Sequence, residues 1–244
     1  MKLKVIKSGL DEIGALRALF LHENNFQFIY NKCHGGWADE YLFTIDGITA
    51  GYGALWGASK REDRDAIFEF YLVPPYRKLA SMVFKEFHKA SGATLVECQS
   101  NDMLLTAMLY EFTENINAEA ILFEEHYQTN LNIPGAIFRR EIDPDSSPQD
   151  VGGYQLVQND EVTASGGFML NYNMPYADIY MEVKENVRQQ GFGSLIIQEL
   201  KKEIYAMGRV PAARCNINNR ASKATLLKAG FRVCGFILKG NLKP

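Results

Sequence analysis

The sequence has little net charge and no long apolar run. Its 26 basic and 29 acidic side chains leave a formal net charge of −3, so it lacks the basic surface expected of a protein that binds nucleic acid. No apolar stretch approaches the roughly 18 residues that a membrane-spanning helix needs, and no basic amphipathic stretch indicates a membrane surface. We therefore expect neither a nucleic-acid partner nor a membrane association.

Cysteine and histidine are also scarce. The four cysteines are Cys33, Cys98, Cys215 and Cys234, which form no C-x-x-C pair, and the four histidines are far apart in sequence. This spacing favours neither a structural zinc site nor a disulfide framework, and we expect no metal. The lysines at the N-terminus are followed by no apolar segment, so the sequence predicts no signal peptide and a cytoplasmic protein.

The remaining composition is that of a globular protein, with 47% hydrophobic and 23% charged residues. At about 150 residues per domain, the length corresponds to about 1.6 domains. Residues 139–153 carry no apolar periodicity and contain Asp143-Pro144-Asp145-Ser146-Ser147-Pro148 and Gly152-Gly153, which is typical of a linker. We predict a first domain at residues 1–142, a linker at 143–153 and a second domain at 154–244.

Helical and strand patterns alternate through both halves and predict an α/β (α+β) fold. The predicted helices cover residues 11–24, 79–90, 102–112, 195–207 and 221–229, with a short helical or irregular piece at 26–33. The predicted strands cover residues 40–45, 48–56, 66–73, 94–98, 120–126, 154–157, 162–171, 177–183, 212–217 and 231–238.

The two halves share an internal repeat. The segment beginning at Asp46-Gly47 resembles the one beginning at Asp160-Glu161, and Phe70–Val73 resembles Tyr180–Val183. Helix, strand, helix and strand follow in both halves, so the order of elements supports the repeat more than residue identity does.

The segment Val183–Ser194 has the chemistry of an anion-binding loop. It contains R-x-x-G-x-G between a predicted strand and a predicted helix. The free N–H groups at a helix N-terminus bind phosphate oxygens, and glycines let the backbone approach a ligand closely. Arg188 adds a fork of donors to the same anion. The alternative is a glycine turn that precedes an ordinary surface helix.

Three motifs together resemble the GCN5-related N-acetyltransferase (GNAT) superfamily. They are V-x-x-x-x-R-x-x-G-x-G at Val183–Gly193, the helix start N-x-x-S at Asn219–Ser222, and the helix-ending Gly230-Phe231. The resemblance is specific over residues 154–244 and rests on element order over 1–142. It implies two mixed, mostly antiparallel sheets flanked by helices, of which the C-terminal one lacks the first helices.

The resemblance also implies an acetyl-CoA site in the second half. The loop would hold the pyrophosphate, and the strand ending at Val183 would pair with the pantetheine arm beside a gap to the next strand, where a backbone N–H polarises the thioester carbonyl. The residues expected to contact acetyl-CoA are Met181, Val183, Arg188, Gln189, Gln190, Gly191, Phe192, Gly193, Ser194, Asn219, Ser222 and Lys223.

Acyl transfer to an amine needs a base, and the candidates on the strand before the loop are Asp178 and Glu182, which share strand parity. Either could instead be a solvated strand residue. Relatives often carry a tyrosine, the general acid, four residues before the helix-ending glycine, but this chain has Leu226 there. Tyr180 or Tyr205 would then protonate the thiolate, or the thiolate would leave unprotonated.

The loop of the first half, Val73–Ser81, has no glycine at which a phosphate could approach the backbone. We therefore interpret this half as a degenerate GNAT-like domain that has lost cofactor binding; the alternative is an unrelated α/β domain. The predicted protein is a tandem-domain, acetyl-CoA-dependent N-acetyltransferase, that is, an acyltransferase. Its acceptor is an unidentified small-molecule or peptide amine, and it is a monomer or homodimer. The alternative function is a non-catalytic acyl-CoA-binding or regulatory module.

Overall fold

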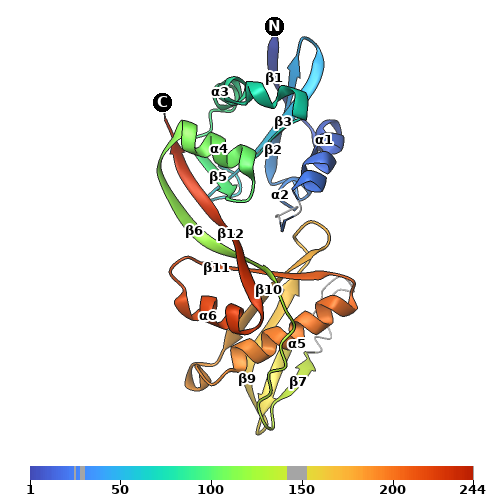
Figure 1. Cartoon of the computed structure of the whole chain (residues 1–244), viewed down its shortest axis with the longest axis vertical. Coiled ribbons are helices and arrows are strands. Elements are labelled where there is room, and N and C mark those ends of the chain that lie inside the picture. Colours follow the sequence, from blue (N-terminus) through green and yellow to red (C-terminus); the bar gives the residue numbers. More distant parts are fainter. Residues whose placement is uncertain (25, 28–30, 142–152, 244) are drawn as a thin grey trace. The chain divides into compact units, whose positions relative to one another are not determined.

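The computed structural model describes residues 1–24, 26–27, 31–141 and 153–243 (Figure 1). The chain forms two compact units. Unit 1 contains Met1–Ala120 and Gly235–Pro244, and unit 2 contains Ile121–Cys234. Each unit combines a mostly antiparallel sheet with helices, so the predicted α/β class is confirmed.

The division between the units differs from the predicted boundary at residues 143–153, which falls inside unit 2. Its flanking strands, β7 (Ile137–Arg140) and β8 (Tyr154–Gln158), pair with each other in antiparallel register from Ile137↔Val157 to Arg140↔Tyr154. The proline- and glycine-rich segment therefore joins two neighbouring strands of one sheet rather than two domains. Residues 142–152 themselves lie outside the described residues.

Unit 1 contains helices on both faces of its sheet, whose strand order is β1-β2-β3-β4-β5-β12-β6. Its elements are β1 (Leu3–Ser8), α1 (Leu10–Glu23), α2 (Asn31–His34), β2 (Ala38–Ile45), β3 (Ile48–Trp56), β4 (Ala66–Leu72), the 3-10 helix η1 (Pro74–Leu79), α3 (Ala80–Ser91), β5 (Leu95–Gln99) and α4 (Met103–Phe112). One apolar core lies between the sheet and α3 and α4, and a second lies between the sheet and α1 and α2.

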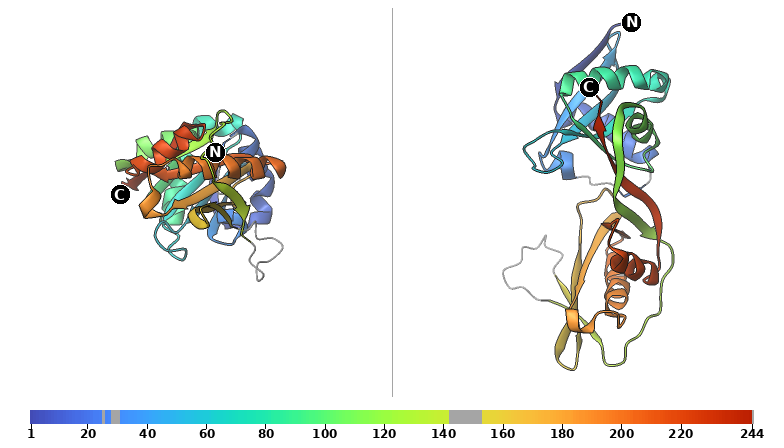
Figure 2. Two further views of the ribbon diagram at one scale, coloured as in Figure 1. Left: turned by 90° about the horizontal axis from the view of Figure 1, so that it is seen from below. Right: turned by 90° about the vertical axis from the view of Figure 1, so that its left-hand side faces the viewer.

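Unit 2 has the strand order β12-β6-β11-β10-β9-β8-β7 and helices on one face (Figure 2). Its further elements are β9 (Glu161–Met169), β10 (Tyr176–Val183), the 3-10 helix η2 (Glu185–Val187), α5 (Phe192–Ala206), β11 (Val210–Asn216) and α6 (Arg220–Lys228). A single apolar core joins the sheet to α5 and α6. Between Ile121 and β10, the described part of unit 2 has no counterpart of α1 and α2, as predicted for the C-terminal half.

Two strands contribute residues to both units: β6 (Thr113–Glu125) and β12 (Phe231–Leu242). In unit 1, β12 lies between β5 and β6 and pairs antiparallel with β5 from Ile237↔Gln99 to Asn241↔Leu95. In unit 2, β6 lies between β11 and β12. Each unit is thus completed by a strand that lies far from its other strands in sequence.

The sequence prediction missed β1, the first half of β6 and all of β7. The residues after Thr113 include Glu114 and Asn115, and the apolar residues become continuously buried only from Ile121 onward. The short β7 is largely exposed and lies at the sheet edge. In β1 and the first half of β6, the apolar residues that alternate with polar ones are only partly buried, and β7 has no alternation. Strand prediction depends on such alternation.

The two units repeat one geometry, at the end of β4 in unit 1 and of β10 in unit 2. In unit 1, β4 pairs in parallel with β5 only at Ala66↔Leu95 and Ile67↔Val96. In unit 2, the parallel pairing of β10 with β11 ends at Asp178↔Ala212. In both units the two strands have no further pairing, so a gap opens in the sheet at the same place.

The arginine that follows each of these strands confirms that β4 and β10 are equivalent. Arg77 Nε donates to Leu72 O at 3.0 Å, and Arg188 Nε donates to Val183 O at 3.3 Å. Leu72 therefore corresponds to Val183, whereas the alignment predicted from sequence paired Leu72 with Glu182. The hairpin turn is also shifted by one residue but in the opposite direction, because the left-handed residues are Asp46 and Gly47 in unit 1 but Asn159 and Asp160 in unit 2.

Candidate functional site

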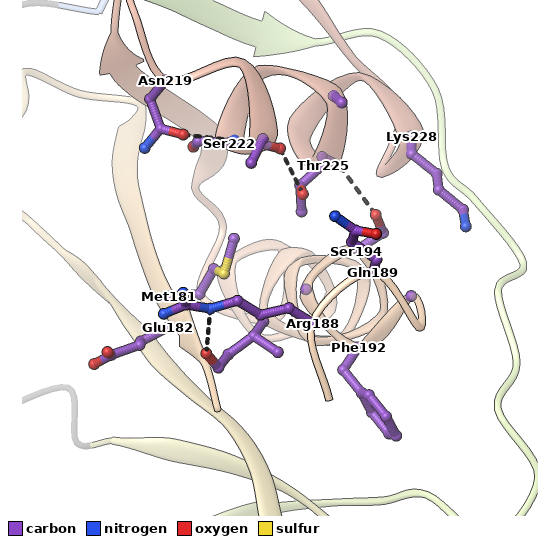
Figure 3. Close-up of a pocket in the computed structure, with 15 residues that line it drawn as sticks. Met181, Glu182, Arg188, Gln189, Phe192, Ser194, Asn219, Ser222, Thr225 and Lys228 are labelled. Carbon is purple, nitrogen blue, oxygen red and sulfur yellow. Dashed lines mark hydrogen bonds between the residues drawn. The ribbon is translucent and has the colours of Figure 1, made fainter. Parts of the chain in front are cut away.

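A pocket of about 700 Å³ opens in unit 2 at the N-terminal ends of α5 and α6 (Figure 3). It brings together the end of β10, the loop after it and one side of α6. The residues lining it are Met181, Glu182, Val183, Arg188, Gln189, Gly191, Phe192, Gly193, Ser194, Asn219, Ala221, Ser222, Ala224, Thr225 and Lys228.

Most of the residues predicted to contact a cofactor lie around this pocket. The exceptions are Gln190 and Lys223, which are exposed and do not line it. The sequence interpretation missed Ala221, Ala224, Thr225 and Lys228. These four residues recur at a spacing of three or four along α6, and this one-sided helical face is the signal that would have identified them.

The loop presents free backbone N–H groups to the pocket. Gly191 caps α5 with φ 96°, a left-handed conformation that favours glycine, and no side chain caps the helix. Gln189 is also left-handed, with φ 65°. The first-turn N–H groups of α5 therefore have no partner within the helix, and the helix dipole makes this end electropositive.

The second glycine of the motif serves packing rather than backbone conformation. An ideal Cβ at Gly193 would lie 3.0 Å from Thr225 Cγ2 and 3.3 Å from Val183 Cγ2. Beside it, Ser194 Oγ donates to Thr225 O at 3.2 Å (Figure 3). Gly193 thus allows α5 to approach both β10 and α6 closely, which shapes the pocket floor.

The other two motifs also have local causes. The Asn219 side chain accepts a hydrogen bond from Ser222 N at 3.0 Å, so it is the N-cap of α6. Gly230 has φ 86°, and an ideal Cβ there would lie 2.2 Å from Tyr127 O. Phe231 begins β12 and is buried in the unit 2 core.

Backbone N–H groups of β10 face the gap between β10 and β11. The Lys184 N–H points toward β9, where it donates to Thr163 O at 3.0 Å. Because N–H groups alternate between the two sides of a strand, those of Ile179, Met181 and Val183 point away from β9. The Ile179 N–H completes the parallel pairing that ends at Asp178↔Ala212, and beyond it this side has no strand partner. The N–H groups of Met181 and Val183 are therefore available to an extended ligand.

Asp178 lies at the closed end of this gap and is buried, with 3% of its surface exposed. Burial raises its pKa to about 6, while Arg214 and the Tyr172 hydroxyl oppose the shift. Arg214 Nε lies 3.7 Å from Asp178 Oδ2. A carboxyl group with this pKa loses its proton near neutral pH and can then accept one from a substrate.

The other predicted catalytic residues are placed differently. Tyr180 and Glu182 are exposed and share the strand parity of Asp178, and Glu182 also lines the pocket. Tyr205 lies on the last turn of α5, about 20 Å along the helix from the loop at its first turn. Leu226 is buried in the core, so the position of the family tyrosine contributes packing here.

The corresponding region of unit 1 is built differently. Its loop is the 3-10 helix η1, which begins with Pro74 and Pro75 and has no glycine. Arg77 forms an ion pair with Glu23. At the N-cap of α4, Asp102 stands where unit 2 has Asn219.

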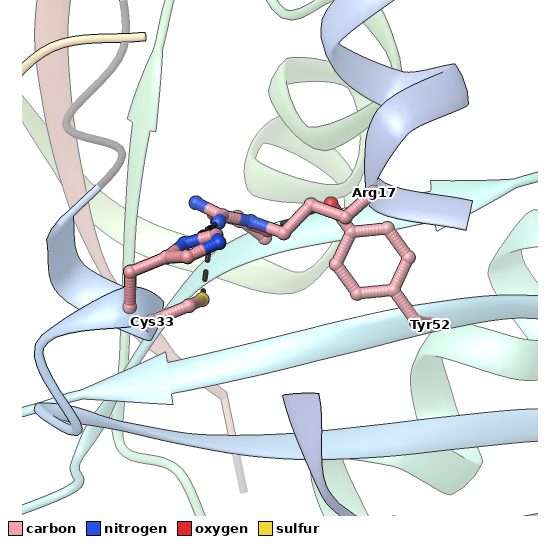
Figure 4. A network of polar contacts seen from close by, with 5 residues as sticks. Arg17, Cys33 and Tyr52 are labelled. Carbon is pink, nitrogen blue, oxygen red and sulfur yellow. Dashed lines mark hydrogen bonds and ion pairs between the residues drawn. The ribbon is translucent and has the colours of Figure 1, made fainter. Parts of the chain in front are cut away.

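Buried polar groups fill unit 1 beside its gap (Figure 4). Glu69, on β4, is fully buried, and both of its carboxylate oxygens accept hydrogen bonds from Arg17 of α1. The Tyr52 hydroxyl donates to Glu69 Oε2 at 2.7 Å. By the strand equivalence, Glu69 occupies the place of Tyr180, which is 48% exposed in unit 2.

Comparisons with known proteins agree with this architecture. The family model described as FR47-like protein matches residues 172–236. A GNAT-family acetyltransferase from Colwellia psychrerythraea aligns over 100% of both chains with a TM-score of 0.79 and 15% identity. A GCN5-related N-acetyltransferase from Sphaerobacter thermophilus aligns over 99% of this chain and 96% of its own, with a TM-score of 0.66 and 12% identity.

A tandem GNAT protein from the clavulanic acid biosynthesis pathway aligns over 100% of this chain and 99% of its own, with a TM-score of 0.60 and 12% identity. No curated protein matches this sequence. The chain has the GNAT fold, which confirms the resemblance that the sequence motifs indicated.

Two further properties of the described residues concern membranes and metals. None of the helices there combines the length and apolar character needed to cross a membrane. Within the same residues, no three His, Cys, Asp or Glu side chains are grouped so that they could hold a metal ion.

Proposed function

We propose that this protein is an acetyl-CoA-dependent N-acetyltransferase whose donor site is the unit 2 pocket. The observation that carries the proposal is the combination, at one pocket, of an uncapped helix N-terminus with the unpaired backbone edge of β10. The first suits a pyrophosphate, and the second suits an extended amide chain. Arg188 and Lys228 add positive charge at the pocket wall.

The dimensions of the site fit a pantetheine arm. Asp178 lies five residues before Val183, which corresponds to about 16 Å along the strand. An arm that starts at the loop and follows β10 would bring its thioester toward Asp178. The N–H of Met181 would then polarise the thioester carbonyl. The twelve residues predicted from sequence remain our proposed acetyl-CoA contacts, with Gln190 and Lys223 at its periphery.

The proposed reaction is attack by a neutral amine nitrogen on the thioester carbon. The C–N bond forms, the C–S bond breaks, and the amine proton passes to Asp178, directly or through water. Because Leu226 is buried in the core, the thiolate leaves unprotonated or takes a proton from Tyr180. Glu182 stays the second candidate base, since it lines the same pocket.

The acceptor is proposed to be an amine of a small molecule or a peptide, and the protein to act in the cytoplasm as a monomer or homodimer. The buried Leu226 favours one other function, an acyl-CoA-binding module without turnover. Release of free thiol from acetyl-CoA in the presence of an amine panel distinguishes the two. Amine-dependent thiol release supports the transferase, whereas binding without release supports the module. Absence of acetyl-CoA binding contradicts both.

A further inference from the structure

Unit 1 has a pocket of its own, with a volume of about 290 Å³. It lies between the C-terminal end of α1, the end of β4 and the first turns of α4. The residues lining it are Phe20, Glu23, Asn24, Phe70, Tyr71, Arg77, Asp102, Met103, Leu104 and Ala107.

Asp102 is the polar residue in this wall whose hydrogen bonds within the protein are incomplete. Its side chain is buried, and the residue is 3% exposed. Oδ1 accepts a hydrogen bond from Leu105 N at 3.1 Å and so caps α4. Oδ2 is buried and has no hydrogen-bond partner among the described residues. A buried carboxylate oxygen without a donor is costly, and a ligand that donates to Oδ2 would remove this cost.

The nearby arginine does not neutralise Asp102, because it is engaged elsewhere in the wall. Arg77 pairs with Glu23, and Glu23 also accepts a hydrogen bond from the Tyr71 hydroxyl at 2.7 Å. With this pair neutral, the Asp102 carboxylate leaves the wall with one negative charge. The pocket is therefore electrostatically suited to a cation.

The rest of the wall is apolar and aromatic. The rings of Phe20 and Tyr71 pack edge to face at 6.1 Å, and Phe70 also lines the pocket. Met103, Leu104 and Ala107 supply aliphatic surface from α4. Aromatic faces attract cations and also bury apolar surface, so the wall suits a ligand with a charged head and an apolar body.

We propose that unit 1 binds a primary ammonium compound with an aromatic or aliphatic body, whose ammonium group donates to Asp102 Oδ2. The proposal goes beyond the acetyl transfer proposed for unit 2 and does not depend on it. Unit 1 would then have replaced the donor site of the shared fold with a site for an amine.

The ionisation of Asp102 gives this site a pH dependence. Burial raises its pKa to about 7, the charge of Glu69 on β4 adds to the shift, and the backbone N–H groups of α4 oppose it. Burial and, to a smaller extent, the Asp102 charge raise the pKa of the Cys98 thiol on β5. Glu23 and Arg77 face the same pocket as a pair. Because an ammonium binds the carboxylate form, its affinity is expected to fall about tenfold per pH unit below 7.

The test is calorimetric titration of the full chain, without acetyl-CoA, using 2-phenylethylamine and n-hexylamine. The variant is Asp102→Asn, since asparagine is an equally good N-cap but carries no charge. Expected are binding of at least one amine, a loss of affinity of at least tenfold in Asp102→Asn, and no comparable binding of the neutral 2-phenylethanol. The matched control is Asp39→Asn, which neutralises another carboxyl group of unit 1 that does not line the pocket and should leave binding unchanged.

Three results would overturn the proposal: no binding of either amine at millimolar concentration, equal binding by Asp102→Asn, or equal binding of 2-phenylethanol. A loss of binding in Asp39→Asn equal to that in Asp102→Asn would also reject the unit 1 site. Circular dichroism and thermal unfolding of Asp102→Asn show that α4 has kept its cap.

Discussion

The two units have the same gap, after β4 in unit 1 and after β10 in unit 2, and use it in opposite ways. In unit 1, α1 covers this region and Arg17 pairs with the buried Glu69. In unit 2, the described residues include no corresponding helix, and Tyr180, at the place of Glu69, is 48% exposed. The sheet geometry is therefore shared, whereas the residues that face the gap decide whether it is filled or open.

The loops after β4 and β10 also differ, because only the loop of unit 2 exposes free N–H groups. Unit 2 enters α5 through the left-handed Gly191 and exposes free N–H groups. Unit 1 enters α3 through the two prolines of η1, and proline has no N–H to offer. Both loops retain one arginine, Arg77 or Arg188, with the same bond to the preceding strand. The proposed phosphate site of unit 2 therefore rests on its N–H groups rather than on this side chain.

The largest effect is expected from breaking the buried pair in unit 1. Arg17→Met leaves the Glu69 carboxylate buried without its cation and should lower the free energy of unfolding by about 3–5 kcal/mol. Tyr180→Ala, at the equivalent strand, should cost less than about 1 kcal/mol because Tyr180 is half exposed. Denaturant unfolding followed by fluorescence reports on unit 1, which contains both tryptophans, Trp37 and Trp56.

Circular dichroism is added for Tyr180→Ala, whose unit contains no tryptophan. Similar small losses for both variants would contradict the comparison, since Glu69 would then not depend on Arg17.

The next largest effect concerns the base proposed for unit 2. Asp178→Asn should lower kcat by roughly 10²–10⁴-fold. In the wild type, kcat should rise as the pH increases through about 6 and then level off, because a base acts only when deprotonated. The variant should lack this rise. Glu182→Gln serves as the matched variant, and a larger loss in Glu182→Gln than in Asp178→Asn would assign the base to Glu182 instead.

A third prediction compares two glycines at opposite ends of α5. Gly191→Val should weaken acetyl-CoA binding by about 100-fold, since a β-branched residue disfavours the left-handed conformation and disturbs the loop. Gly208 has φ 70° and open space around it, so Gly208→Val imposes similar backbone strain away from the pocket. It should destabilise by about 1–3 kcal/mol yet keep normal affinity in calorimetry. Equal losses of affinity would attribute the Gly191 effect to general destabilisation.

The smallest effect separates the two equivalent arginines. Arg188→Ala should weaken acetyl-CoA binding by about tenfold, the value expected for one exposed, charge-assisted hydrogen bond. Arg77→Ala should leave this affinity unchanged, because its loop exposes no N–H cradle. Equilibrium dialysis with acetyl-CoA measures both. A weaker affinity in Arg77→Ala would show that unit 1 takes part in donor binding.

Sequence reasoning located most of the pocket because its signals are local. Gly191, Asn219 and Gly230 each meet a requirement of their own backbone, namely a left-handed helix start, a helix cap and a close approach to Tyr127. Such requirements act within a few residues and so leave a motif in the sequence. Thr225 and Lys228 were missed because they reach the pocket only through the packing of α6 on α5.

Other features depend on contacts between distant segments. Residues far apart in sequence meet where β6 and β12 contribute to both units. The same holds for the Arg17–Glu69 pair and for the burial of Asp178. The proline- and glycine-rich segment was misread as a domain boundary because turn residues also connect paired strands. Local pattern cannot distinguish a long hairpin connection from a linker.

We propose that the two units share a fold but that only unit 2 holds acetyl-CoA. Calorimetric titration of the full chain with acetyl-CoA, performed alongside Gly191→Val, tests it most directly. We expect a stoichiometry of about one acetyl-CoA per chain, with this binding lost in the variant. A stoichiometry near two, one site that persists in Gly191→Val, or no binding at millimolar acetyl-CoA would contradict it.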